Sequence, residues 1–292
     1  MNNEFPPTAE DAFTSTSENI FSIEDIHRQR EYTSPPTYIG NLTADGRLDS
    51  DALKNIKFVR NPGGSLWIWE MPDLEEKVSN RYVVFLDIGG RSFKSDWSVL
   101  RVLDRYWRMY GGKSQFVATW KLHIDHDILA WKAAQLAAFY DNALLAVEIN
   151  SLLRDAEDKD TDHAVTILDT IMDCYPNLYM RTTIDSITKQ ESTKPGFLTT
   201  SKTKNLIIDT MNAALRDDQY QECDTRALDE ASIFVQHPDG TMGNVKGKGL
   251  HDDMVITSAG CLYLDRHYMP MPKIINTTPI RNKIRTTSVA II

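Results

Sequence analysis

Cysteine is scarce in this sequence. The 292 residues include only Cys174, Cys223 and Cys261, without a Cys-x-x-Cys pair or a paired histidine spacing. Neither a zinc site nor a disulfide framework is readable from such a set. We therefore predict buried thiols in a reducing compartment.

Long apolar runs are absent as well. The longest apolar stretch, 133–147, is interrupted by polar side chains, and the first ten residues are acidic and contain proline. A membrane-spanning helix needs about 20 consecutive apolar residues, and a secretory signal needs a basic start before its apolar region. The sequence therefore predicts no membrane span, secretory signal or transit peptide.

Positive charge is in deficit: 32 basic against 41 acidic side chains give a net charge of -9. A phosphate backbone repels such a protein unless basic groups gather locally or metal ions intervene, so the charge alone argues against nucleic acid. A content of 41% hydrophobic and 25% charged residues is ordinary for a folded protein. The length suits one large domain, or one domain with an appendage.

Three regions differ in composition. Residues 1–36 are rich in Ser, Thr, Glu and Pro with one small apolar cluster, which predicts an extended arm or linker without a core. Residues 37–265 form the predicted main domain. Residues 266–292 form a basic tail, predicted either as a phosphate-binding or partner-binding arm or as an unstructured solubilising end. The basic residues at this end are Lys273, Arg281, Lys283 and Arg285.

The hydrophobic pattern of the main domain predicts an α/β fold with a mixed sheet. An apolar run over 82–86, bounded by Asp87, indicates a central strand buried on both faces. Further strands are predicted at 65–70, 97–104, 116–124, 143–149, 178–180 and 232–236. The strands at 82–86, 97–104 and 116–124 form a predicted antiparallel meander. Helices are predicted at 127–141, 164–173, 203–215 and 251–264, the last after a Gly and Lys-rich loop over 239–249.

Carboxylates interrupt this apolar pattern where a charge is hardest to explain. Asp87 ends an apolar strand before two glycines, Glu148 interrupts another strand, and Asp252-Asp253 opens an apolar helix. Burying an uncompensated carboxylate costs on the order of several kcal/mol, so another group must neutralise the charge. A bound divalent cation does so most directly. If the strands of Asp87 and Glu148 are neighbours, their side chains meet at one sheet edge, and Asp96 crosses a hairpin back to them.

Oxygen ligands of this kind suit Mg²⁺ or Mn²⁺. Two such ions about 4 Å apart activate water and stabilise the leaving oxygen of a phosphodiester, which implies nucleic-acid hydrolysis. Each acid also has a structural interpretation: Asp87 as a turn or cap residue, and Asp252 as a helix N-cap. Glu148 is harder to explain in that way, because nothing at its position demands a charge.

Three other motifs resemble functional sites of different kinds. Gly112-Lys113-Ser114 resembles the end of an ATP-binding P-loop, but Trp107 stands where a small residue is required and a strand follows, so a hairpin turn is predicted. Asp87-Ile88-Gly89-Gly90 resembles the first phosphate loop of actin-like ATPases, without their second loop. The cluster of His123, Asp125, His126 and Asp127 is more typical of surface residues than of a metal site.

The ordered set of motifs resembles the nuclease domain of the large terminase subunit of tailed bacteriophages, which has a ribonuclease-H-like fold. The segments that carry the resemblance, over most of the chain, are 4–13 with Ile20-Phe21, 82–96, 146–150, 175–179, 196–204 and 249–255. The sequence departs from the whole terminase subunit in having no Walker A motif and no ATPase body. Residues 1–36 then correspond to the end of the ATPase domain and its linker.

The resemblance implies a metal-dependent endonuclease that cleaves concatemeric double-stranded viral DNA during packaging, without ATPase activity of its own. Asp87, Glu148 and Asp252 become the catalytic triad that holds two Mg²⁺ or Mn²⁺ ions, with Asp253 and Asp96 as further ligands; whether Asp252 or Asp253 is the principal one stays open. Lys94, Arg91, Lys246 and Lys248 are candidate DNA phosphate contacts or solvated loop residues.

The implied partners are double-stranded DNA, the terminase ATPase domain, the small terminase subunit and the portal, with no membrane. The isolated chain is expected as a monomer, and the expected location is the cytoplasm of the host cell. Two alternatives come from other classes: a non-catalytic assembly module that docks on the portal or small subunit, and a phosphotransferase of the actin-like group.

Overall fold

The computed structural model describes residues 19–89, 97–150, 168, 171–184, 190–245 and 251–275. Its centre is an eight-stranded mixed sheet, with strands in the order β2-β1-β3-β7-β6-β5-β8 and β11 paired with β7. The bounds are β1 Tyr38–Thr43, β2 Lys57–Arg60, β3 Leu66–Ile68, β5 Tyr82–Asp87, β6 Ser98–Asp104, β7 Ser114–Leu122, β8 Leu144–Val147 and β11 Tyr220–Gln221.

The central strands follow the predicted meander. β5 pairs antiparallel with β6, β6 pairs antiparallel with β7, and β8 lies parallel to β5 on its other side. All seven residues of β6 are buried, as are the first five of β5. This confirms the predicted mixed sheet with a central strand buried on both faces.

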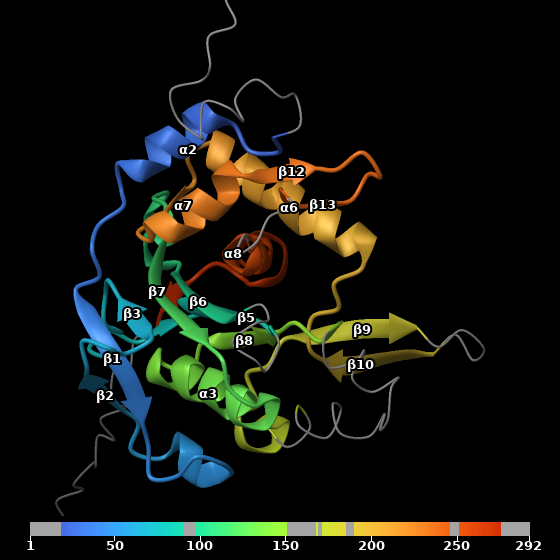
Figure 1. Cartoon of the computed structure of the whole chain (residues 1–292). Coiled ribbons are helices and arrows are strands. Elements are labelled where there is room, and N and C mark those ends of the chain that lie inside the picture. The colour runs from blue at the N-terminus through green and yellow to red at the C-terminus, as the bar shows by residue number, and fades with distance from the viewer. Residues whose placement is uncertain are drawn as a thin grey trace, which may run out of the picture.

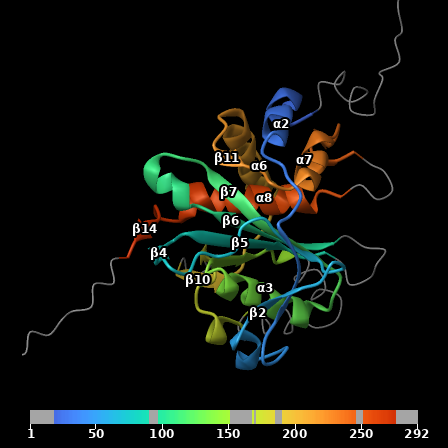
Figure 2. The same cartoon turned by 90° about the vertical axis from the view of Figure 1, so that its left-hand side faces the viewer.

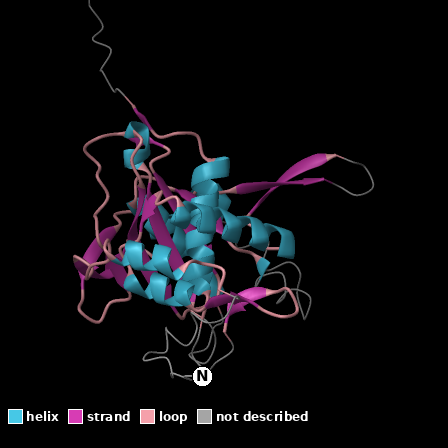
Figure 3. Ribbon diagram, turned by 90° about the horizontal axis from the view of Figure 1, so that it is seen from above, coloured by secondary structure: helices cyan, strands magenta, loops and turns pink. Residues whose placement is uncertain are grey.

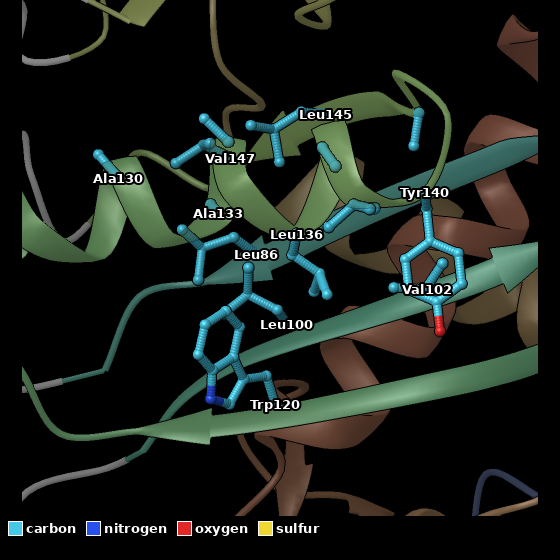
Figure 4. Packing of buried hydrophobic residues seen from close by; sticks show 14 of the residues in the cluster. Leu86, Leu100, Val102, Trp120, Ala130, Ala133, Leu136, Tyr140, Leu145 and Val147 are labelled. Atoms are coloured by element: carbon cyan, nitrogen blue, oxygen red, sulfur yellow. The ribbon is translucent and has the colours of Figure 1, made fainter. Parts of the chain in front are cut away.

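Helices cover both faces of the sheet (Figure 1). α3, His126–Phe139, lies on one face, and α2 Ile23–Arg30, α6 Ser201–Arg216, α7 Thr225–Ser232 and α8 Asp253–Tyr263 lie on the other. Figure 4 shows Leu136 and Ala133 of α3 facing Leu86, Leu100 and Trp120 of the sheet. The helices predicted over 127–141, 203–215 and 251–264 correspond to α3, α6 and α8, and part of that predicted over 164–173 lies outside the described residues.

Alternation along the strands sorts side chains between two cores. Val84 and Leu86 of β5 belong to the core beneath α3, whereas Val83 and Phe85 belong to the core beneath α6 and α8. Asp87, two residues after Phe85, therefore lies on the α8 face. Gly260 of α8 allows close approach to this face, because a Cβ at this position would overlap the Phe85 ring.

Smaller elements surround the sheet. The hairpin of β9 Met180–Ile184 and β10 Glu191–Pro195 projects from the body (Figure 3). β12 Phe234–Gln236 pairs with β13 Met242–Asn244, which lies inside the segment predicted as a loop, and β4 Val78–Ser79 pairs with β14 Lys273–Ile274. Short helical turns are η1 Ser50–Leu53, η2 Tyr106–Tyr110 and the π-helical η3 Leu264–Tyr268, which continues α8.

The N-terminal segment differs from its prediction. We expected residues 1–36 to contribute no core, yet Phe21 and Ile26 are fully buried in the core beneath α6 and α8. The Ile20 amide donates to the Phe234 carbonyl at 3.1 Å, and Gln29 Nε2 donates to the Tyr220 carbonyl at 2.9 Å. An apolar cluster too small to fold alone is therefore buried against elements 190 residues away in sequence.

The C-terminal segment is also held where the structure describes it. The Ile275 amide donates to the Lys77 carbonyl at 2.7 Å, beside the β4–β14 pair. Cys174, Cys223 and Cys261 are free thiols; Cys223 and Cys261 are buried, as predicted, whereas Cys174 is only half-buried. Burial raises the pKa of each of those two thiols to about 12. Within the described residues, no helix combines the length and apolarity needed to traverse a bilayer.

Candidate functional site

Asp87 and Glu148 end two adjacent strands. β5 and β8 are in register at Leu86 and Val147, and the Glu148 amide donates to the Leu86 carbonyl at 2.8 Å. Glu148 follows Val147 and therefore continues the parallel pairing beside Asp87. Both side chains lie on the α8 face, because Phe85 and Ala146, two residues earlier on each strand, belong to that core.

Glu148 is buried and closely held. Its Oε2 accepts the amide of Asn150 at 3.1 Å. Asn150 also accepts the Thr199 amide at 3.0 Å and donates to the Thr199 carbonyl, which links the end of β8 to the segment before α6. Thr200 caps α6 through the Thr203 amide and hydroxyl, so the helix start is fixed close to Glu148.

Asp252 and Asp253 lie at the start of α8. Asp252 occupies the N-cap position but makes no side-chain capping bond, so it does not behave as the structural N-cap considered from the sequence. Its carboxylate pairs instead with Lys204 of α6, whose Nζ lies 3.4 Å from Oδ2. Asp253 is buried, and its Oδ2 accepts the backbone amide of Trp97 at 3.2 Å.

The electrostatics show that these acids act on one another. Burial, followed by repulsion from Glu148, Asp253 and Asp252, raises the pKa of Asp87 well above its ordinary value, and Lys204 opposes the increase. The three sequence-predicted acids and Asp253 thus share one electrostatic environment at one end of the sheet. The carboxylates come from two strand ends and one helix start, which are far apart in the chain.

Glu230 and Lys121 also border these acids, and neither was predicted from the sequence. Glu230 of α7 accepts the Met254 amide at 2.7 Å, where it satisfies a free donor of the first turn of α8. It also pairs with Lys121 of β7 at 3.6 Å. Burial raises the pKa of Glu230, Lys121 lowers it and Asp252 raises it. Lys121 is paired with Val99 in the sheet, as Asp87 is, so it lies on the same row.

An aromatic pair lies at the edge of this region. The ring centroids of Trp97 and His123 are 3.7 Å apart, and Lys121 lies 6.0 Å above the Trp97 ring. His126 Nε2 lies 3.2 Å from the Gly89 carbonyl, close after Asp87. Lys121 and Glu230 carried no signal in the sequence, because isolated charges on ordinary helices and strands are common.

Several predicted residues lie outside the described part of the chain: Asp96, Lys94, Arg91, Lys246 and Lys248. Among the described residues, no three His, Cys, Asp or Glu side chains approach closely enough to hold a metal ion as they stand. We expected Asp87, Glu148 and Asp252 to converge. They share an end and a face of the molecule, and their joint hold on a metal ion stays a prediction.

The structure also shows the contacts of the P-loop-like and histidine-containing motifs. Lys113 of the P-loop-like sequence pairs with Asp218 at 2.5 Å and with the Tyr32 hydroxyl at 2.8 Å, and Ser114 donates to Asp265 at 2.9 Å. These residues lie at the β6–β7 turn and are committed to structural contacts, as the predicted hairpin turn requires. His126 and Asp127 begin α3, and Asp125 is its N-cap.

Comparison with solved structures gives this geometry a context. The magnesium-bound large terminase nuclease of thermophilic phage G20c matches with a TM-score of 0.50 and 14% identity, over 85% of this chain and 97% of that chain. Its cobalt-bound form matches with a TM-score of 0.51 at the same identity and coverage. The chain has the fold of this terminase nuclease.

A further match is the terminase nuclease domain of human cytomegalovirus, soaked with manganese and bound to an inhibitor, with a TM-score of 0.41, 12% identity and coverage of 68% and 89%. No protein-family model and no curated protein matches the chain. The observed strand order confirms the predicted mixed α/β sheet, and the G20c nuclease match shows a protein with the same fold.

Proposed function

We propose that this chain is a divalent-metal-dependent endonuclease that cleaves double-stranded DNA during viral genome packaging. The observation that carries the proposal is the electrostatic coupling of Asp87 to Glu148, Asp253 and Asp252 at one end of a terminase-nuclease fold. Structural acids are normally compensated by bases, whereas burial and then repulsion from Glu148, Asp253 and Asp252 raise the pKa of Asp87.

The donor set fits a hard divalent cation. Carboxylate oxygens are the ligands that Mg²⁺ and Mn²⁺ prefer, and Asp87, Glu148 and Asp252 would hold the ion, with Asp253 as a further ligand. Bound there, two such ions would supply an activated water and charge stabilisation at phosphorus.

The surrounding residues would then position the substrate. Lys204, which pairs with Asp252, and Lys121, which pairs with Glu230, place positive charge beside the acids, which favours the approach of a phosphate backbone. The stacked Trp97 and His123 border the same region. Lys94, Arg91, Lys246 and Lys248 remain proposed contacts to flanking phosphates, and Asp96 remains a proposed further ligand.

The proposed biological setting is the packaging machinery in the cytoplasm of the host cell. The partners would be the terminase ATPase domain, the small subunit and the portal, and the chain would have no ATPase activity of its own. The absence of a Walker A motif from its 292 residues supports this division of labour.

The proposal is tested by nicking of supercoiled plasmid with Mg²⁺ or Mn²⁺. Wild-type protein should cut, and Asp87→Asn and Asp252→Asn should each lose cutting by at least about a hundredfold. Asp209→Asn, at an exposed position of α6, is the matched control and should cut normally. Undiminished cutting by both site variants would overturn the proposal.

Two other functions make different predictions. A non-catalytic assembly module would show no ion near Glu148 and Asp87 in anomalous scattering from crystals soaked with Mn²⁺. An actin-like phosphotransferase would bind ATP in calorimetry, whereas the proposed nuclease should not.

A further inference from the structure

The turn that joins β6 to β7 exposes aromatic side chains. η2 carries Trp107 and Tyr110, which are 56% and 62% exposed. Their ring centroids are 6.3 Å apart, and both rings also contact Tyr106. Contiguous exposed apolar side chains of this size mark interaction sites on folded proteins, because leaving them in water forgoes their burial.

The aromatic turn lies beside a second exposed apolar segment. The Tyr106 hydroxyl donates to Glu76 Oε2 at 2.7 Å, which fixes the loop before β4 against η2. That loop exposes Leu74, and β4 pairs with β14, where Ile274 and Ile275 are exposed. Figure 2 shows β4, β14 and the β6–β7 turn on one side of the molecule. We call Leu74, Trp107, Tyr110, Ile274 and Ile275 the aromatic surface.

Two carboxylates beside the aromatic surface, those of Glu75 and Glu76, are open to a basic occupant, and Lys273 of β14 is the basic residue on that strand. Arg81 pairs with Asp73 and Asp104, and Arg108 pairs with Asp265, so these arginines are already matched. Glu75 is exposed beside Leu74, and within the described residues neither Glu75 nor Glu76 forms an ion pair. An occupant that combines apolar and basic side chains would suit this surface.

We propose that residues 276–292 of the same chain dock on the aromatic surface. They follow Ile275 directly, so the occupant starts at the edge of its site. They contain Arg281, Lys283 and Arg285, no acidic side chain, and apolar residues that include Ile280 and Ile284. Six extended residues span roughly 20 Å, which is enough to carry Arg281 from β14 across the surface.

The chemistry of the two partners is complementary. Guanidinium groups stack on the faces of Trp and Tyr, and such contacts strengthen when they exclude water. Isoleucine side chains of the tail would cover Leu74 and Ile274, and its cations would approach Glu75 and Glu76. Because η2 follows Asp104 while Asp87 lies at the opposite end of the β5–β6 pair, docking leaves the candidate site uncovered. The inference is independent of the proposed function.

The test is trypsin digestion of the full chain, with cleavage after Arg281, Lys283 and Arg285 followed by mass spectrometry. Cleavage of a docked segment tracks its undocked population, so docking slows it. The double variant Trp107→Ser, Tyr110→Ser should accelerate cleavage about tenfold. The double variant Glu75→Gln, Glu76→Gln should accelerate cleavage by a smaller factor. Leu206→Ser, at a 43% exposed position of α6, is the control and should change nothing.

The outcomes separate the possible occupants. Protection that is unchanged on dilution and lost in the aromatic variant supports docking within one chain. Equal cleavage of wild type and aromatic variant, with thermal melting showing both folded, overturns the proposal. Protection that disappears on dilution also overturns it, because the surface would then be covered by a second copy.

Discussion

Glu148 stands beside Asp87 because its amide donates to the Leu86 carbonyl at 2.8 Å, one step beyond the last paired residues of β5 and β8. Two carboxylates on one face of adjacent parallel strands repel each other, and Asp252 and Asp253 of α8 add to the repulsion at Asp87. The fold therefore keeps like charges close, which lowers its stability. Such a loss of stability is typical of functional sites.

Removal of one of these charges should raise the stability of the protein and lower its nuclease activity. Without divalent cation, we expect Asp87→Asn to raise the melting temperature by about 2–4 °C, because roughly 1 kcal/mol of repulsion and burial is relieved. The same variant should lose cleavage. Thermal melting in chelator measures the first effect, with Asp209→Asn as the control. A lower melting temperature for Asp87→Asn would show that its charge stabilises the fold.

Lys204 should tune cation affinity. Its ammonium lies 3.4 Å from the Asp252 carboxylate and lowers the pKa of Asp87, so it repels a cation bound between them. We expect Lys204→Met to tighten Mn²⁺ binding by about three- to tenfold, which corresponds to roughly 1 kcal/mol of electrostatic repulsion. Titration calorimetry measures the affinity.

Lys202→Met is the matched control, since Lys202 lies on the same helix and is exposed. It should leave Mn²⁺ affinity unchanged. Weaker Mn²⁺ binding by Lys204→Met would mean that Lys204 organises the carboxylates instead of repelling the ion.

The close approach of α8 to β5 depends on Gly260. A methyl group at this position would overlap the Phe85 ring, which is fully buried and cannot move aside. We expect Gly260→Ala to lower the free energy of unfolding by about 1–3 kcal/mol, even though alanine favours the helix. Urea denaturation measures it. Gly63→Ala, where an added Cβ has room, should be neutral, and equal stability of both variants would refute the packing argument.

The ends of β5 and β8 and the start of α8 could be predicted because each is an apolar run interrupted by an acid. Interruption of a buried pattern is a local signal, and the three elements needed only their own residues to be recognised. How closely the acids approach was not predictable, since it depends on how α8 packs on the sheet. The structure places Asp87, Glu148 and Asp252 at one end of the sheet, and their shared hold on a metal ion stays a prediction.

The other buried residues could not be predicted, because their burial depends on partners that are distant in the sequence. Phe21 and Ile26 belong to a segment too polar to indicate a core. They are buried because residues of α6, α7 and β12 pack against them. Glu230 is an ordinary acid on a short helix until the first turn of α8 is placed against it. Arg101 in the buried strand β6 is explained by Glu222, 121 residues away, at 2.6 Å.

Asp224 should make stability depend on acid pH. Burial opposes its charge, but the ion pair with Arg226 at 2.6 Å outweighs burial and lowers the pKa of Asp224. A carboxyl whose pKa is lower folded than unfolded stabilises the protein above its unfolded pKa of about 3.9, and this stability is lost as the pH falls through the folded pKa.

At pH 7, we therefore expect Asp224→Asn to be less stable than wild type by about 1–3 kcal/mol, the worth of hydrogen bonds to a charged group. Asparagine retains an oxygen to cap α7, so the loss reports the charge. The difference should shrink progressively below about pH 4, because wild type then becomes neutral at this position. Urea denaturation of both proteins at pH 7 and near pH 3 measures this, and a difference that stays constant across that range would exclude the Asp224 charge as its source.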